Sequence, residues 1–485
     1  MTIPTPAARR PRSLASWILL AAALLAAAPM PASRAWAFSV AEEREVGEQL
    51  LAMVRQELAL LDDPDLTAYV TRIGRQVLGQ AGVQYFDYHF FVVRDKELNA
   101  FAAPSGLIFI HSGLIETMDS EDELYGVLAH EIGHVVSRHI AERMEKGTKV
   151  GIGTMAAVLA GALLGSGDLA QAVITGALAT GSSLNLKFSR QDEEEADRLA
   201  FHWLQEIDRD PHGQLDTLRR LRRYQMMSTG KLPPYLLTHP DPEARMGYVQ
   251  DLLAISSGRT YPKSDPFDFL RFKQRIRVAS RDPASLIPHF TKELAAAGEP
   301  QAEALARYGL ALAQLAAGNA QAAAEGLAAV VAAEPNRPIL QADLGVALHE
   351  AGRYQEAKEV LTQARDRDPE LGYATFHLAR ALGQLGERPR AIALLEGLIP
   401  ILPDYSRLYF DLGGLHSAEG HTGVAYYYLG MHSWLTGDPE RAVDFYKRAL
   451  TELDSTDPLY EESKARWKRI QELEMDKQRR RQGGG

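Results

Sequence analysis

Residues 121–140 read EDELYGVLAHEIGHVVSRHI, and this stretch organises the half of the chain around it. Its apolar residues recur at the spacing of one helical face, which predicts an α-helix. On a helix, residues four apart lie on one face with Cβ atoms ~5–6 Å apart. His130 and His134 can therefore bind the same ion at about 2.0–2.1 Å. The segment predicts a helix that carries two ligands of one zinc ion.

The residue after the first histidine suits the same site. The side chain of Glu131 can reach the coordination position that the two histidines leave open. A carboxylate there can accept a proton from a water molecule whose pKa zinc lowers to about 7. The five-residue pattern also arises by chance, so the interpretation needs a further ligand.

An acidic run on a second predicted helix, 190–207, supplies that ligand. Glu193 and Asp197 are four residues apart and share a face. A glutamate from a second helix completes a two-His, one-Glu zinc site with one open position. Asp197 is suited to hydrogen-bond the second nitrogen of a ligand histidine. A solvated acidic face is the alternative, and it is retained for Glu194 and Glu195.

The amino-acid composition excludes several classes of protein and of functional site. The chain has 485 residues, 46% of them hydrophobic and 24% charged, which suggests about two to four domains. It has no cysteine, so disulfides, thiolate zinc sites and cysteine nucleophiles are excluded, and any metal must be held by His, Asp or Glu. The formal net charge of −10 argues against a nucleic-acid partner.

The first 37 residues have the form of a secretory signal peptide. Basic residues around Arg9 precede an apolar run, 14–28, and a small-residue cleavage site ends at Ala37. An uncleaved membrane anchor is the alternative, but the apolar run is short for a span of about 20 residues. Export without disulfides predicts a periplasmic protein.

Residues 298–475 repeat with a fixed period. Gly318, Gly352, Gly386 and Gly420 are each 34 residues apart, and columns of Leu, Ala and Pro keep the same step. A 34-residue helix–turn–helix unit is the tetratricopeptide pattern. Stacked units form a curved array whose concave surface binds a protein or peptide, with a passive spacer as the alternative.

These patterns divide the chain into consecutive parts. The predicted parts are a signal peptide at 1–37, a zinc metalloprotease domain at 38–255, a linker with an amphipathic helix at 256–297, the repeat domain at 298–475 and a disordered tail at 476–485.

Three motifs of the metalloprotease domain carry a family resemblance. They are His-Glu-Ile-Gly-His at 130–134, Glu193 with Asp197 inside the run from Ser189, and Thr238-His239-Pro240 followed by Arg245. With them the chain resembles the HtpX/BepA-type zinc metalloproteases, gluzincins related to the CAAX prenyl proteases. The resemblance implies that His130, His134 and Glu193 bind zinc and that Glu131 is the general base. With the repeats, the layout is similar to the periplasmic branch of that family.

Two segments before the first histidine read as β-strands, 88–93 and 107–111. The intervening residues Asn99, Ala100, Phe101 and Ala102 are a candidate substrate strand, because a strand beside a zinc cleft can pair with an extended peptide. The alternative is an ordinary core hairpin that turns at 104–106, and the two interpretations are compatible.

Two residues of the third motif have open roles. His239 precedes a proline, which favours extended backbone and a loop position. It is a candidate oxyanion donor or substrate contact, or a reversible fourth zinc ligand that keeps the protease off; an exposed structural histidine is the alternative. Arg245 is expected to orient Glu193, Asp197 or the oxyanion, with a surface cation as the alternative.

Residues 150–186 are rich in Ala, Gly and Leu. A helical hairpin over the catalytic core is expected, with a mobile lid or peripheral membrane contact as the alternatives.

The sequence therefore predicts a mainly α protein with a small β-sheet, in which a zincin-type metalloprotease domain precedes an α-solenoid of tetratricopeptide repeats. The predicted activity is cleavage of peptide bonds with one Zn²⁺ per chain. By resemblance, the substrates are unfolded or misassembled envelope proteins in outer-membrane protein quality control, and the repeats recruit substrate or the assembly machinery. The alternatives are a chaperone-like repeat scaffold with minor or masked proteolysis, and a zinc hydrolase for non-peptide substrates.

Overall fold

The computed structural model describes residues 39–146, 187–227 and 232–483. The predicted signal peptide and the segment 150–186 lie outside these ranges. Among the described residues, no helix combines the length and apolarity that crossing a bilayer requires.

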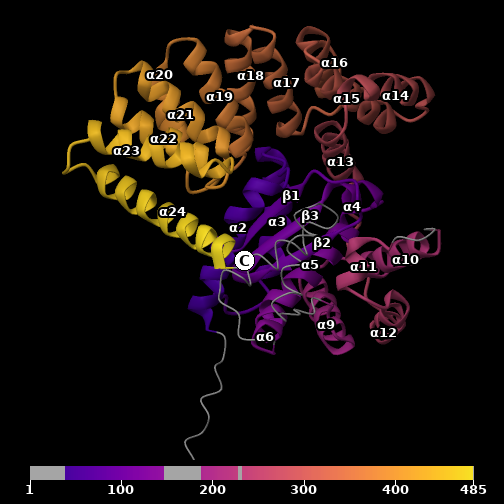
Figure 1. Cartoon of the computed structure of the whole chain (residues 1–485). Coiled ribbons are helices and arrows are strands. Elements are labelled where there is room, and N and C mark those ends of the chain that lie inside the picture. The colour runs from indigo at the N-terminus through magenta and orange to yellow at the C-terminus, as the bar shows by residue number, and fades with distance from the viewer. Residues whose placement is uncertain (1–38, 147–186, 228–231, 484–485) are drawn as a thin grey trace, which may run out of the picture. The chain divides into compact units, whose positions relative to one another are not determined.

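A small sheet lies inside the first half of the chain (Figure 1). Its strands are β1 (His89–Val93), β2 (Ala100–Ala103) and β3 (Leu107–His111), in the order β1-β3-β2. β1 runs parallel to β3, and β2 runs antiparallel to it. A 3₁₀ turn, η1 (Pro104–Gly106), joins β2 to β3. The predicted hairpin is therefore present, and β2 is its outer strand.

Helices surround this sheet. They are α2 (Val40–Glu57), α3 (Pro64–Leu78), α4 (Ser112–Thr117), α5 (Glu121–Val136), α6 (His139–Lys146), α9 (Arg190–Glu206), α10 (His212–Met227), α11 (Pro234–Thr238) and α12 (Pro242–Ile255). α5 is buried over almost its whole length, because it packs against α3, α9, α10 and β2.

The helix predicted from 121 to 140 breaks early. The Ser120 side chain caps α5 by accepting a hydrogen bond from the Glu123 N–H. The helix ends at Val136, and Arg138 takes a left-handed conformation with φ 53°. A left-handed residue cannot continue a right-handed helix, so the chain turns and α6 begins at His139.

The segment 256–297 contains two helices, α13 (Pro266–Ser280) and α14 (Pro283–Ala296). Each begins with a proline at its first position, where the missing N–H costs nothing. Phe267 of α13 and Phe290 of α14 are fully buried in the same apolar cluster as the repeats. These helices are packed parts of the helical array as well as a connection.

The repeats form successive antiparallel helices. They are α15 (Pro300–Ala316), α16 (Ala320–Ala333), α17 (Pro338–Glu350), α18 (Tyr354–Arg367), α19 (Gly372–Gln384), α20 (Arg388–Leu398), α21 (Ser406–Ala418), α22 (Thr422–Leu435), α23 (Pro439–Glu452) and α24 (Pro458–Gly483). The predicted fold class, a mainly helical protein with a small sheet and tetratricopeptide-like repeats, is confirmed.

The backbone explains the glycine column. Gly318, Gly352, Gly386 and Gly420 have φ between 77° and 86° and follow the first helix of each pair. Glycine populates this left-handed region without the Cβ penalty, so it ends one helix and starts the turn.

The predicted disordered tail at 476–485 differs from the structure, since α24 continues to Gly483. The preceding sequence explains the difference, because Glu, Lys, Arg and Gln favour helix. Ion pairs such as Glu462–Arg466, four residues apart with N–O at 2.9 Å, add to it.

Two glycines with the same backbone conformation give a matched stability test. Gly437 (φ 77°) packs against α2, where an added Cβ would clash with the Arg55 carbonyl oxygen. At Gly386 (φ 82°) an added Cβ meets nothing. We expect Gly386→Ala to lower the free energy of unfolding by about 1–2 kcal/mol through backbone strain. Gly437→Ala should cost about 1–3 kcal/mol more through the clash. Urea unfolding of both variants checks this, and equal losses would contradict it.

Candidate metal centre

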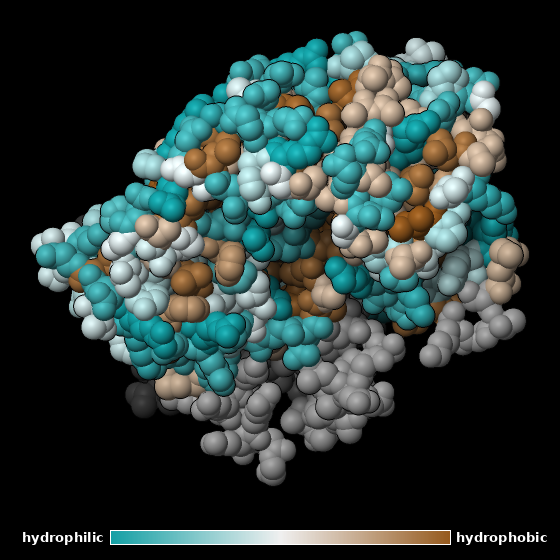
Figure 2. Space-filling model, turned by 90° about the horizontal axis from the view of Figure 1, so that it is seen from above, coloured by the Kyte–Doolittle hydropathy of each residue, from teal (hydrophilic) through white to brown (hydrophobic). Residues whose placement is uncertain are grey.

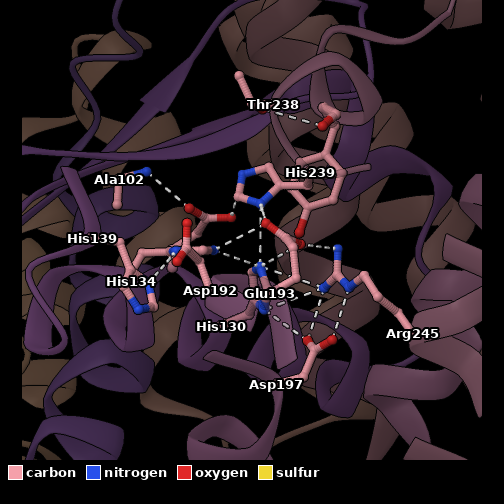
Figure 3. A network of polar contacts seen from close by, with 12 residues as sticks. Ala102, His130, His134, His139, Asp192, Glu193, Asp197, Thr238, His239 and Arg245 are labelled. Atoms are coloured by element: carbon pink, nitrogen blue, oxygen red, sulfur yellow. Dashed lines mark hydrogen bonds and ion pairs between the residues drawn. The ribbon is translucent and has the colours of Figure 1, made fainter. Parts of the chain in front are cut away.

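Four buried side chains converge on one point in the first half of the chain. Ligand atoms of His130, His134, Glu193 and His239 all lie within 4.8 Å of one another. The Nε2 atoms of His130 and His134 are 3.0 Å apart, and the Glu193 oxygens lie 3.5–3.6 Å from them. Figure 3 shows these side chains pointing toward one another. The structure thus brings together the three predicted ligands and His239, the candidate fourth ligand.

The chemistry of this cluster fits a divalent ion. Its donors are imidazole nitrogens and a carboxylate, the set that zinc takes in proteins without thiolate ligands. The Nε2 of His239 and the Oε1 of Glu131 are buried without a hydrogen-bond partner among the described residues, and they lie 3.6 Å apart. Buried polar atoms normally have partners, so a bound cation accounts for the convergence of these donors.

Two helices position the ligands. α5 carries His130 and His134, and α9 carries Glu193, packed directly against α5. Gly133 faces α9, where an added Cβ would lie 3.1 Å from the Ala196 backbone. The glycine between the two histidines therefore lets the helices approach closely enough for one ion to bind both.

A buried network of hydrogen bonds and ion pairs supports the metal ligands. Asp197 lies 2.7 Å from the Nδ1 of His130. Arg245 donates two hydrogen bonds of 2.8 Å to Asp197 and lies 2.8 Å from the Oε2 of Glu193. The Tyr248 hydroxyl donates a further bond of 2.7 Å to Asp197. The structure thus places Asp197 and Arg245 against the ligands and away from the surface.

The charges of this network shift the pKa values of Asp197 and Glu193. Burial would raise the pKa of Asp197, but Arg245 and His130 together hold it well below its usual value. Burial raises the pKa of Glu193 to about 7, against the opposing effect of Arg245. Asp197 is therefore a permanent anion beside His130, which favours the tautomer whose Nε2 is free to bind metal.

Replacing Asp197 by Asn tests this support. Asparagine keeps the shape but removes the charge that fixes the His130 ring. We expect zinc affinity to fall about 10- to 100-fold, measured by competition with a chelating dye. Glu194→Gln on the same helix, an exposed residue paired with Arg198, should bind zinc as the wild type does. Equal affinities for Asp197→Asn and the wild type would contradict the role of Asp197.

Glu131 lies between the cluster and the outer strand of the sheet. Its Oε2 accepts a 2.9 Å hydrogen bond from the Ala102 N–H of β2. The side chain is fully buried, which raises its pKa. Of the candidate substrate strand, Ala100, Phe101 and Ala102 belong to β2, and Asn99 precedes it. In the described sheet β2 pairs only with β3, and the Ala102 N–H on its other edge donates to Glu131.

His239 ends α11 and is completely buried. Its Nδ1 lies 3.0 Å from Glu193 and 3.3 Å from the Nε2 of His130. Burial lowers its pKa to about 3, so the ring is neutral and able to bind a metal. The alternative of an exposed structural histidine does not describe this position.

Two further residues touch a ligand and were not predicted as part of the site. The Nδ1 of His139 lies 2.9 Å from the Nδ1 of His134, on the side away from the cluster. His139 is five residues after His134, which is out of phase for one helical face, but the turn at Arg138 brings the two rings together. Phe188 stacks on His134 with ring centroids 3.8 Å apart. No local pattern marks a lone phenylalanine for this position.

Two protein-family models match this chain, one in each of its two halves. The model of peptidase family M48 matches residues 64–253, and a tetratricopeptide repeat model matches residues 348–412. The chain is 32% identical over 277 residues to a beta-barrel assembly-enhancing protease of Yersinia pestis, covering 56% of each protein. It is 28% identical over 390 residues to the protein of the same name from Escherichia coli (strain K12), covering 73% of this chain and 80% of that one.

A solved repeat structure, YrrB, described as a repeat protein with an unusual peptide-binding site, is more distant. It covers 41% of this chain and 97% of its own at 14% identity and a TM-score of 0.29. The family matches and the buried ligand cluster agree on the identity of the first half. Residues 64–253 therefore form a peptidase domain of family M48 that contains the buried His130/His134/Glu193 cluster, and tetratricopeptide repeats follow this domain.

Proposed function

We propose that the protein is a periplasmic endopeptidase that binds one zinc ion per chain and cleaves unfolded or misassembled envelope proteins. The observation that carries the proposal is the position of Glu131. Its carboxylate lies between the His130/His134/Glu193 cluster and the free edge of β2. A base, a metal site and a strand that can hold a substrate therefore meet at one place.

Each residue at this site has a separate role in the proposed reaction. Zinc held by His130, His134 and Glu193 supplies Lewis-acid polarisation. Glu131 accepts a proton from the attacking water and delivers it to the leaving amine. β2 pairs with the substrate backbone, whose ladder hydrogen bonds do not depend on side chains. Arg245 and Asp197 keep the ligands oriented.

Unfolded segments are the substrates that suit this site. A peptide can add to the edge of β2 only in an extended conformation, which a folded protein does not present. The relatives named beta-barrel assembly-enhancing protease support envelope proteins, and outer-membrane barrels in particular, as the class of substrate. We propose that the repeats recruit these proteins or the machinery that assembles them.

We further propose that His239 restrains the protease as a reversible fourth ligand. Its Nδ1 lies 3.0 Å from Glu193 and 3.3 Å from the Nε2 of His130, within reach of an ion that the three other residues bind. The cluster and all four residues of β2 are buried, so a substrate requires the site to open. This burial also gives some support to the scaffold alternative, in which proteolysis is masked and the repeats act as a chaperone.

Digestion of an envelope protein in two states tests the function. The zinc-loaded chain lacking residues 1–37 is incubated with a β-barrel outer-membrane protein, either urea-unfolded and diluted or folded in detergent. We expect fragments from the unfolded barrel only, identified by mass spectrometry. Turnover of small esters without cleavage of either form would point to a non-peptide hydrolase.

A cellular test separates protease from scaffold. In cells that lack the gene, the wild type and Glu131→Gln are compared for resistance to antibiotics that the envelope normally excludes. We expect rescue by the wild type alone. Full rescue by Glu131→Gln would favour the scaffold.

A further inference from the structure

Two aromatic rings pack against the imidazole of His239. The Tyr235 ring stacks on it with centroids 4.4 Å apart and an angle of 20° between planes. The Phe188 ring lies 4.9 Å away at 32°. Tyr235 and Phe188 are 2% and 8% exposed. Neither side chain has a part in the proposed chemistry, so their position calls for another role.

The backbone of Phe188 also contacts the segment that carries His239. Its backbone N–H donates a 2.8 Å hydrogen bond to the carbonyl of Thr238, the residue before His239. The guanidinium of Arg143 lies 4.0 Å from the ring centroid and holds the ring by a cation–π contact. Phe188 is thus hydrogen-bonded to the backbone segment that carries His239.

Tyr235 is equally tied to that segment. The His239 N–H donates a 2.8 Å hydrogen bond to the Tyr235 carbonyl, one turn back along α11. The Tyr235 N–H in turn donates a 3.4 Å bond to the carbonyl of Leu98, just before β2. The ring that covers His239 is therefore anchored beside the strand that we propose for the substrate. Pairing of a substrate with β2 would act directly on this anchor.

We propose that Phe188 and Tyr235 are positioning residues that clamp His239 against the metal cluster and so set how often the site is open. This inference rests on the proposed role of His239 as a reversible ligand. Each stacked pair favours the closed arrangement by about two- to tenfold. Loosening one ring should therefore open the site without removing any of His130, His134 and Glu193.

Cobalt spectroscopy of the mature chain tests the clamp. Co²⁺ replaces zinc, and its visible absorption reports the number and geometry of its ligands. His239→Ala defines the spectrum of the open site. We expect Phe188→Leu and Tyr235→Leu, which keep an apolar side chain but lose the stacked ring, to shift the spectrum toward it. Tyr235→Phe, which keeps the ring, should give the wild-type spectrum.

Cleavage of an unstructured fluorogenic peptide by the zinc-loaded variants gives a second readout. Both leucine variants should raise kcat/KM about two- to tenfold. In a His239→Ala background neither should change the spectrum or the rate further, because the ring would have nothing to hold.

The results separate the possible failures. If His239→Ala shifts the spectrum and neither leucine variant does, the clamp is wrong and the role of His239 stands. If Phe188→Leu shifts the spectrum equally with and without His239, the ring acts through His134, and the clamp is again wrong. If His239→Ala changes neither spectrum nor cleavage, the role of His239 and the clamp both fail, while the peptidase activity is unaffected by that result.

Discussion

Glu131→Gln should lower kcat for peptide cleavage by about 10²–10⁴-fold, the usual contribution of a positioned general base. Glutamine keeps the size of the side chain, and its oxygen can still accept the hydrogen bond from the Ala102 N–H, which is 2.9 Å in length. It cannot accept a proton from water. We therefore expect chemistry to fail while the site stays assembled.

Zinc content and melting temperature distinguish this result from a folding defect. Glu131→Gln should hold one zinc per chain and melt with the wild type or slightly above it, because it replaces a buried carboxylate whose pKa burial raises. Glu194→Gln is the matched control, an exposed acid on α9 that should keep full activity. Wild-type activity in Glu131→Gln would remove this residue from the mechanism.

Arg271→Ala should lower the free energy of unfolding by about 3–5 kcal/mol, the cost of leaving a buried charge without its partner. Arg271 of α13 is 2% exposed. It donates to both oxygens of Asp65 on α3, at 2.8 and 3.0 Å, and to the Tyr308 hydroxyl of α15 at 3.2 Å. Removing it leaves Arg275, 3.4 Å away, as the one cation paired with the buried Asp65 among the residues that the structure describes.

An exposed ion pair on the repeats gives the comparison. Arg353 and Glu356 are 2.6 Å apart, with side chains 38% and 55% exposed. Arg353→Ala should lower the free energy of unfolding far less than Arg271→Ala does, since water solvates both charges of the exposed pair. Guanidinium chloride unfolding, followed by circular dichroism, measures both variants. A loss at Arg271 no larger than that at Arg353 would show that the buried network adds little to stability.

The buried network also shows why the connection between the two halves was only partly predictable. The segment 256–297 was predicted to be a linker with one helix, but Pro266 and Pro283 each begin a helix and Pro288 lies inside α14. Proline at the first helical position favours a helix. Asp65 and Arg271 are 206 residues apart, and no local pattern links them.

The metal cluster was predictable because each ligand follows from helical spacing. His130 and His134 share a face of α5, and Glu193 with Asp197 shares a face of α9. Spacing alone could not indicate the burial of His239, because that depends on a tertiary fold that brings His239 to Glu193 and His130, residues 46 and 109 positions away. Nor could it indicate His139, which reaches His134 only because the chain turns at Arg138.

The central claim is that His130, His134 and Glu193 bind one zinc ion beside Glu131. Crystals of the mature chain, measured above and below the zinc absorption edge, test it most directly. The account predicts a single anomalous peak about 2.0–2.2 Å from His130 Nε2, His134 Nε2 and a Glu193 oxygen, absent in Glu193→Ala. A zinc peak elsewhere in the chain, or none at this cluster in zinc-loaded active protein, would contradict it.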